Sequence, residues 1–171
     1  MAATSTRDIT ITLTTADWTA LRDGILSAAQ SLDGPGWCLH LQTGDDEICA
    51  TCAENIANAQ DLHNLARTLT TSLTAIAIPA DGPRSDPAGL SVTLSAFDWP
   101  LAIAGLNQAA SWVVDTNGSD CTGCGVSRVC AGCRDDLRRA VQWCLLAERV
   151  ALQVARSGRL VTEGGGFAAN R

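Results

Sequence analysis

The stretch Ile11-Thr-Leu-Thr-Thr-Ala-Asp-Trp18 returns 81 residues later as Val92-Thr-Leu-Ser-Ala-Phe-Asp-Trp99. In each copy, apolar and polar residues alternate first, as in a strand with one buried face. A Thr or Ser then stands three residues before an Asp, which resembles the capping box that starts a helix, with Asp in place of the usual Glu. Each copy therefore predicts a strand that runs directly into a helix.

The offset of 81 residues continues on both sides of this stretch without a gap. It relates Gly24 to Gly105 and, further along, the Cys-x2-Cys pairs that begin at Cys49 and Cys130. Glycine inside a helix costs about 1 kcal/mol relative to alanine, so its recurrence predicts close packing at both positions. The chain is therefore expected to be a tandem pseudo-two-fold repeat of strand, helix, cysteine loop and helix.

The expected fold is α+β, mostly α, with the two strands paired as a short antiparallel ribbon. The strands are expected at 9–14 and 90–95, the first helices at 15–32 and 96–114, and the second helices at 53–78 and 134–156. We expect repeat one at 8–79, a linker at 80–89, repeat two at 90–157 and a flexible C-terminal tail at 158–171. The two repeats are expected to form one compact unit.

Helical spacing also predicts which faces of the second helices are buried. The predicted faces hold Ile56, Leu62, Leu65, Leu69, Leu73 and Ile76 in the first repeat, and Leu137, Ala140, Val141, Cys144 and Ala151 in the second. His63 and Cys144 match at the same offset, each 11 residues beyond the last cysteine of its loop. At about 1.5 Å per residue, that is roughly 16 Å along a helix, so we expect packing rather than metal binding for both.

Composition indicates a soluble globular chain, with 46% hydrophobic residues. No apolar run approaches the roughly 20 residues of a membrane span, and the N-terminus lacks a signal-peptide core, so a cytoplasmic location and no membrane contact are expected. All twelve basic residues are Arg, a bias that indicates an actinobacterium, or a phage or plasmid living in one. Residues 1–81 carry a net charge of −7 and residues 82–171 carry +1, which argues against phosphate binding by the first half.

Eight cysteines in a reducing compartment favour metal binding over a disulfide scaffold. In repeat two, Cys121-x2-Cys124-x5-Cys130-x2-Cys133 supplies four thiolates, which suits a closed, structural Zn²⁺ site. An iron–sulfur cluster and unliganded packing or redox thiols are the alternatives.

Repeat one keeps the second pair as Cys49-x2-Cys52, with Cys38-Leu-His40 upstream. In an extended segment, residues two apart point the same way, so Cys38 and His40 are predicted to complete a Cys₃His zinc site. His40 corresponds to Cys121 at the offset of 81, which supports it as a ligand. Two zinc ions per chain are therefore expected.

The spacing Cys121-x2-Cys124-x5-Cys130 resembles the last three cysteines of the WhiB-like iron–sulfur regulators of actinobacteria. The resemblance covers ten residues. The upstream cysteine and the Gly-Trp turn of that family have no counterpart here, Cys133 is an additional cysteine, and the duplication is not a family feature. The resemblance implies an iron–sulfur cluster as the alternative to zinc, and the family's function is not carried over.

Motifs of catalysis are absent from the sequence. It contains no H-E-x-x-H, no GxxxxGK[ST] and no GxSxG, and both histidines are already assigned. Filled metal sites leave no open position for a substrate, so we expect no enzyme activity, no catalytic residues and no small-molecule substrate. A thioredoxin-like dithiol is a redox alternative, although three Cys-x2-Cys copies fit metal sites better.

Five arginines of the last helix fall within roughly 80° of arc at about 100° per residue. They are Arg134, Arg138, Arg149, Arg156 and Arg159. Acidic residues flank this arginine face, and Leu145 and Leu152 interrupt it, which favours a solvated face or a protein partner over a nucleic acid. The expected function is a non-enzymatic, zinc-stabilised interaction or regulatory module with a protein partner. A DNA-binding regulator that uses the arginine face, and an iron–sulfur or dithiol redox protein, are the alternatives.

Overall fold

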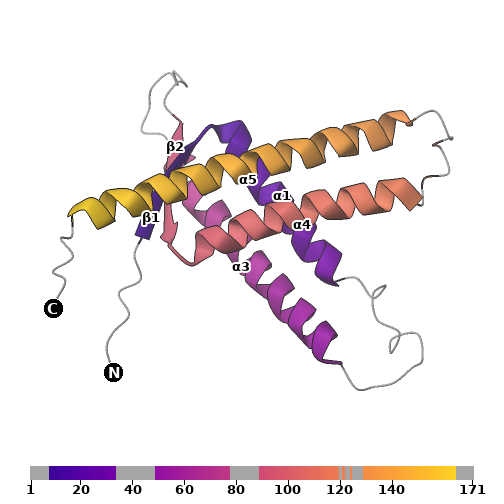
Figure 1. The fold of residues 1–171 in the computed structure, drawn as a ribbon, viewed down its shortest axis with the longest axis horizontal. Coiled ribbons are helices and arrows are strands. Elements are labelled where there is room, and N and C mark those ends of the chain that lie inside the picture. The colour runs from indigo at the N-terminus through magenta and orange to yellow at the C-terminus, as the bar shows by residue number, and fades with distance from the viewer. Residues whose placement is uncertain are drawn as a thin grey trace.

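The computed structural model describes residues 8–33, 49–77, 89–119, 121, 124 and 129–164. These residues form, in order, β1 (Asp8–Leu13), α1 (Thr15–Asp33), α3 (Ala50–Ala77), β2 (Leu90–Ser95), α4 (Asp98–Ser119) and α5 (Ala131–Gly164). The described chain is mostly helical, with one two-stranded antiparallel sheet, as predicted. Figure 1 shows α4 and α5 side by side, with the strands crossing the C-terminal half of α5.

The ribbon of β1 and β2 has one buried and one exposed face. Its register places Ile11 opposite Val92 and Leu13 opposite Leu90. The apolar side chains of Ile11 and Val92 are buried, whereas the alternate hydroxyl side chains bond to each other on the outer face, Thr10 to Thr93 at 2.7 Å. The alternation in the sequence therefore fixed which face of the ribbon packs on the helices.

Two buried tryptophans join the strands to the helices that follow them. Trp18 is 1% exposed and Trp99 is fully buried, with ring centroids 6.3 Å apart. The indole N–H of Trp18 donates to the Leu90 carbonyl of β2 at 2.9 Å. That of Trp99 donates to the Ile9 carbonyl of β1 at 3.0 Å. Because each donor bonds to the strand of the other half, the two bonds tie the halves of the chain together.

The two predicted helix starts differ in detail. The Asp17 N–H donates to Thr14 Oγ1 at 3.1 Å, which is the capping bond expected at the start of α1. In the second half, Ser95 Oγ accepts instead from the Phe97 N–H at 3.2 Å, within a turn. Helix α4 therefore begins at Asp98 rather than at residue 96, and it runs on to Ser119 rather than ending at 114.

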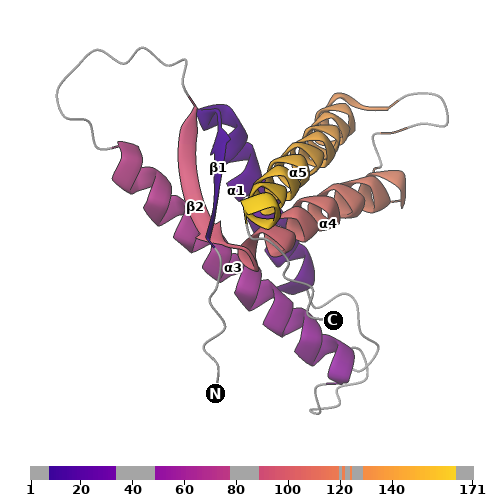
Figure 2. The same cartoon turned by 60° about the vertical axis from the view of Figure 1, so that its left-hand side comes forward.

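Close packing at the two recurring glycines is confirmed. A Cβ atom at Gly24 would lie 2.5 Å from Leu106 Cδ2 and 3.0 Å from Trp143 Nε1. A Cβ atom at Gly105 would lie 2.9 Å from Leu62 Cδ2. The nearest neighbours are side chains of other helices, and their approach allows α1 to pack closely on α4 and on α5 (Figure 2).

Both second helices begin earlier than predicted. Helix α3 starts at Ala50 and α5 at Ala131, so Cys52 and Cys133 lie in their first turns. Helix α5 also continues to Gly164, into the segment predicted to be a tail at 158–171. Gly158 does not end α5, because one glycine costs a helix only about 1 kcal/mol relative to alanine.

The buried face of α3 agrees with prediction at Leu62, Leu65 and Leu69, whereas Ile56 is 40% exposed. The side chain of Ile76 lies outside the described residues.

The predicted buried face of α5 is wrong for two of its residues. Val141 is 59% exposed, and Cys144 is exposed rather than packed. The helix instead buries Ala140, Trp143, Leu146, Ala147 and Val150. Trp143 decides this orientation, because its large ring enters the core and its indole N–H donates to the Ala20 carbonyl at 3.0 Å.

None of the helices, over the described residues, is both long and apolar enough to cross a membrane.

An ion pair joins the first turn of α1 to the middle of α5. Arg149 donates two hydrogen bonds to the Asp17 carboxylate, at 2.6 and 3.0 Å. The Asp17 side chain is 20% exposed and that of Arg149 is 52% exposed. This bidentate bond, followed by smaller effects that include the Thr14 hydroxyl, lowers the pKa of Asp17 below its usual value.

We expect Asp17→Asn to lower the free energy of unfolding at neutral pH by about 1 kcal/mol, as for a well-formed but partly exposed ion pair. Because the folded pKa of Asp17 is lowered, its contribution is present above the unfolded pKa of about 4 and is lost as the pH falls through the folded value. Urea unfolding of both proteins between pH 7 and pH 2 measures this difference. A difference that does not shrink toward low pH would contradict the prediction.

Candidate metal centre

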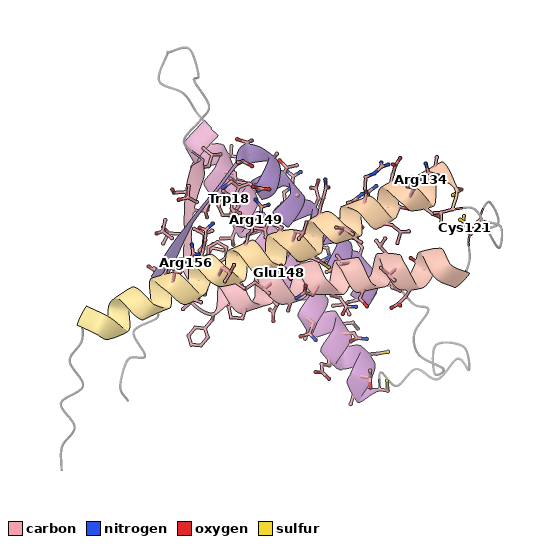
Figure 3. All side chains as sticks on the ribbon, turned by 45° about the horizontal axis from the view of Figure 1, so that its top comes forward. Trp18, Cys121, Arg134, Glu148, Arg149 and Arg156 are labelled. Carbon is pink, nitrogen blue, oxygen red and sulfur yellow. The ribbon has the colours of Figure 1, made fainter. Side chains whose placement is uncertain are left out.

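Four cysteines meet where α4 ends and α5 begins. Cys121 follows the end of α4 by two residues, and Cys124 comes three residues later. Cys130 directly precedes α5, and Cys133 lies in its first turn. Figure 3 shows Cys121 beside the first turn of α5, close to Arg134. The cluster therefore joins the C-terminal end of α4 to the N-terminal end of α5.

The geometry of the cluster suits a tetrahedral metal ion. All four Sγ atoms lie within 4.8 Å of one another. Those of Cys121 and Cys130 are 3.6 Å apart. With Zn–S bonds of about 2.3 Å, neighbouring sulfurs of a regular tetrahedron are separated by about 3.8 Å. Small movements of the side chains would therefore bring all four sulfurs to one ion.

Backbone N–H groups donate hydrogen bonds to two sulfurs of the cluster. The Cys130 N–H donates to Cys124 Sγ at 3.3 Å, and the Cys133 N–H donates to Cys130 Sγ at 3.4 Å. Hydrogen bonds to ligand atoms of this kind hold the ligands of a metal site in position. The turn at Cys121 is closed by a hydrogen bond from the Cys124 N–H to the Cys121 carbonyl, at 3.2 Å.

The thiols also influence one another. Hydrogen bonding to Cys121, then to Cys130 and Cys124, raises the pKa of the Cys133 thiol well above its usual value. Burial of Cys133 adds to this rise. Cysteines bind zinc as thiolates, so metal binding would release protons and would weaken as the pH falls.

The second cysteine pair of the first half has the same local structure. Cys49 directly precedes α3, and Cys52 lies in its first turn. The Ala53 N–H bonds to the Cys49 carbonyl at 3.0 Å, just as the Arg134 N–H bonds to the Cys130 carbonyl at 3.0 Å. The predicted ligands Cys38 and His40 lie outside the described residues. The Cys₃His site therefore stays a prediction.

His63 and Cys144 do not belong to the four-cysteine cluster. His63 Nε2 lies 2.9 Å from the Asp33 carboxylate, at the end of α1. Cys144 is exposed on α5.

The residues of the arginine face are spread along α5. Arg134 lies beside the cysteine cluster, whereas Arg149 and Arg156 lie far along α5 (Figure 3). Arg138 pairs with Asp135 one turn away, and Arg149 pairs with Asp17. The side chain of Arg159 lies outside the described residues. The partner of Arg149 is 132 residues away in the sequence, so no local pattern could reveal it.

The four cysteines of the cluster could together bind one metal ion. Comparison of this chain with protein-family models, with curated proteins and with solved structures finds no match.

Proposed function

We propose that this protein is a non-enzymatic interaction module in which a structural Zn²⁺ ion joins α4 to α5. The observation that carries the proposal is the set of four Sγ atoms within 4.8 Å of one another at the junction of these helices. Zinc prefers four thiolates in a closed tetrahedral site, and such a site contributes directly to folding. A site filled by protein ligands leaves no place for a substrate, which supports a binding role.

The proposal includes a second zinc ion in the first half, held by Cys38, His40, Cys49 and Cys52. Its support is the shared backbone geometry at Cys49 and Cys130, where the same hydrogen bond precedes a helix. The proposal also treats the halves as two copies of one unit. The hydrogen bonds of Trp18 and Trp99 to the opposite strands support this. The two donors are 81 positions apart, and so are the two acceptors, Leu90 and Ile9.

We expect two zinc ions per chain in the purified wild-type protein and one in the Cys130→Ser, Cys133→Ser variant. The Cys49→Ser, Cys52→Ser variant is also expected to keep one ion, since each variant removes half of one ligand set. Elemental analysis against protein concentration measures these ratios. Cys144→Ser is the matched control and should keep both ions, because Cys144 is exposed and outside the cluster. Iron with acid-labile sulfide in place of zinc would overturn the proposal in favour of a cluster protein.

A further inference from the structure

Two grooves lie at corresponding places in the two halves of the molecule. A groove of about 520 Å³ lies between α1 and α5, where Ala16 and Ala20 face Leu145 and Leu152. A groove of about 310 Å³ lies between α3 and α4. The second is lined by Asp61, Asn64, Leu65, Thr68, Asp98 and Leu101. Each of these six residues stands 81 positions from a residue that lines the first groove.

The chemistry of the two grooves differs although their positions correspond. The α3–α4 groove is lined by Asn64 and Thr68. The residues 81 positions later, in the α1–α5 groove, are Leu145 and Arg149. One turn further along, Thr71 corresponds to Leu152. Polar side chains therefore predominate in the α3–α4 groove, whereas the α1–α5 groove has a larger apolar part beside the charged side chains of Asp17, Glu148 and Arg149. The larger apolar part belongs to one half alone and is not required by the shared fold.

Three apolar side chains of α5 are more than half exposed. Val141, Leu145 and Leu152 are 59%, 55% and 57% exposed. Their spacing of four and seven residues places them on one face of the helix. Ala16 and Ala20, one turn apart on α1, leave space beside Leu145 and Leu152. A groove with anchors at this spacing is what an amphipathic helix fills.

Positive charge stands at both ends of this apolar stripe. Arg138 lies one turn before Val141, and Arg156 lies one turn after Leu152. Arg138 forms an ion pair with Asp135. The two side chains are 68% and 63% exposed, so the pair is weak and Arg138 can bind another carboxylate instead. A partner with carboxylates near both ends of its apolar face would complement these arginines.

Charge also argues against two other occupants. A second copy packed along the same face would place arginine-bearing ends against each other, whether the helices run parallel or antiparallel. A nucleic acid would meet three exposed apolar side chains, and the groove itself contains the carboxylates of Asp17 and Glu148. In Figure 3, Glu148 and Arg149 lie in the middle of α5, between Arg134 and Arg156.

We propose that the α1–α5 groove docks an amphipathic helix of a protein partner, whose apolar stripe covers Leu145 and Leu152 and whose acidic end turns meet Arg138 and Arg156. This inference rests on the proposed interaction-module function and names the partner's chemistry. Between Arg138 and Arg156 the helix advances about 27 Å at 1.5 Å per residue, so a docked helix of about 18 residues spans the surface.

The test uses the metal-loaded, full-length protein and a fluorescently labelled, helix-forming peptide of about 18 residues, with Leu at i, i+4 and i+7 and Glu in both end turns. A peptide with Lys in place of Glu, and a DNA duplex of matched length, are the comparison probes. Fluorescence anisotropy at physiological salt measures binding. The critical variant is Leu145→Asn, Leu152→Thr. It keeps the fold because these side chains are exposed and the other half carries Asn64 and Thr71 at the same positions.

We expect the acidic peptide to bind and the double variant to weaken binding by at least about tenfold, as for the loss of two central anchors. Val114→Thr, which changes an exposed apolar residue of α4 outside the groove, should leave the affinity unchanged. No binding up to millimolar peptide, equal binding of the Lys peptide, or equal binding by the double variant would overturn the proposal. Tight DNA binding that survives the double variant would overturn it in favour of a nucleic-acid surface.

Failure of this inference is distinguishable from failure of the proposed function. If zinc binds and stabilises the fold but the peptide does not bind, the docking proposal is refuted and the zinc proposal stands. If the peptide binds to a protein that holds no zinc, the zinc proposal is refuted and the docking proposal stands.

Discussion

Loss of the metal from the four-cysteine cluster is expected to lower the free energy of unfolding by roughly 3–5 kcal/mol, or the melting temperature by about 10 °C. Structural zinc binds finger peptides with about 10–16 kcal/mol, but part of that free energy is offset by ordering the chain that carries the ligands. Helices α4 and α5 also pack through buried residues such as Leu106 and Trp143, which do not depend on the metal. We therefore expect the helix ends to open while the core persists.

Thermal unfolding of Cys130→Ser, Cys133→Ser followed by circular dichroism measures this effect at one site. Hydrogen exchange adds the location, because amide protection should fall first at the beginning of α5. Cys144→Ser is the control and should unfold like the wild type, since its thiol is exposed. A chelator should destabilise the wild type more than the variant. Equal melting temperatures for the wild type and the variant would show that the cluster does not stabilise the fold.

Trp18→Ala and Trp99→Ala are each expected to destabilise the protein by about 3–5 kcal/mol, the usual cost of removing a buried aromatic side chain. The two costs should be similar, because the side chains are 1% and 0% exposed and each donates one hydrogen bond to the opposite strand. Trp18→Phe isolates the bond. Phenylalanine keeps an aromatic ring at this position but has no N–H to donate to the Leu90 carbonyl. We expect it to lower the free energy of unfolding by about 1–3 kcal/mol.

Urea unfolding at neutral pH measures these free energies. Phe97→Ala is the matched aromatic control. Its side chain is 71% exposed, so its effect should lie within about 0.5 kcal/mol. The two tryptophan rings are 6.3 Å apart, so the double variant should cost less than the two single variants added together. A cost below that of the Phe97 control at either tryptophan would contradict the assigned role.

Much of this fold could be predicted because its determinants are local. The alternation of Ile9, Ile11 and Leu13 with threonines sets the strand, and Thr14 sets the start of the helix that follows. Gly24 and Gly105 indicated close packing, because the sequence repeats a residue that helices disfavour. The spacing of four cysteines predicted a shared metal site, and their sulfurs do lie within 4.8 Å of one another.

The orientation of α5 could not be predicted in the same way. Its sequence has apolar residues on more than one side, so periodicity allowed a buried face that included Val141 and Cys144. The structure buries Trp143 and exposes Val141, because only the tryptophan fits the space beside Gly24 and reaches the Ala20 carbonyl. That rotation placed Leu145 and Leu152 in the groove with α1.

The sequence by itself determined the strands, the helices and the four-cysteine cluster, since each depends on residues that are close in the chain. Only the tertiary structure decided which face of α5 is exposed and that Arg149 meets Asp17, 132 residues away. The physical reason is that burial is settled by the shape of the neighbouring helices, which no single segment specifies. The groove between α1 and α5 is the result, and its apolar lining is one of the differences between the two halves of the chain.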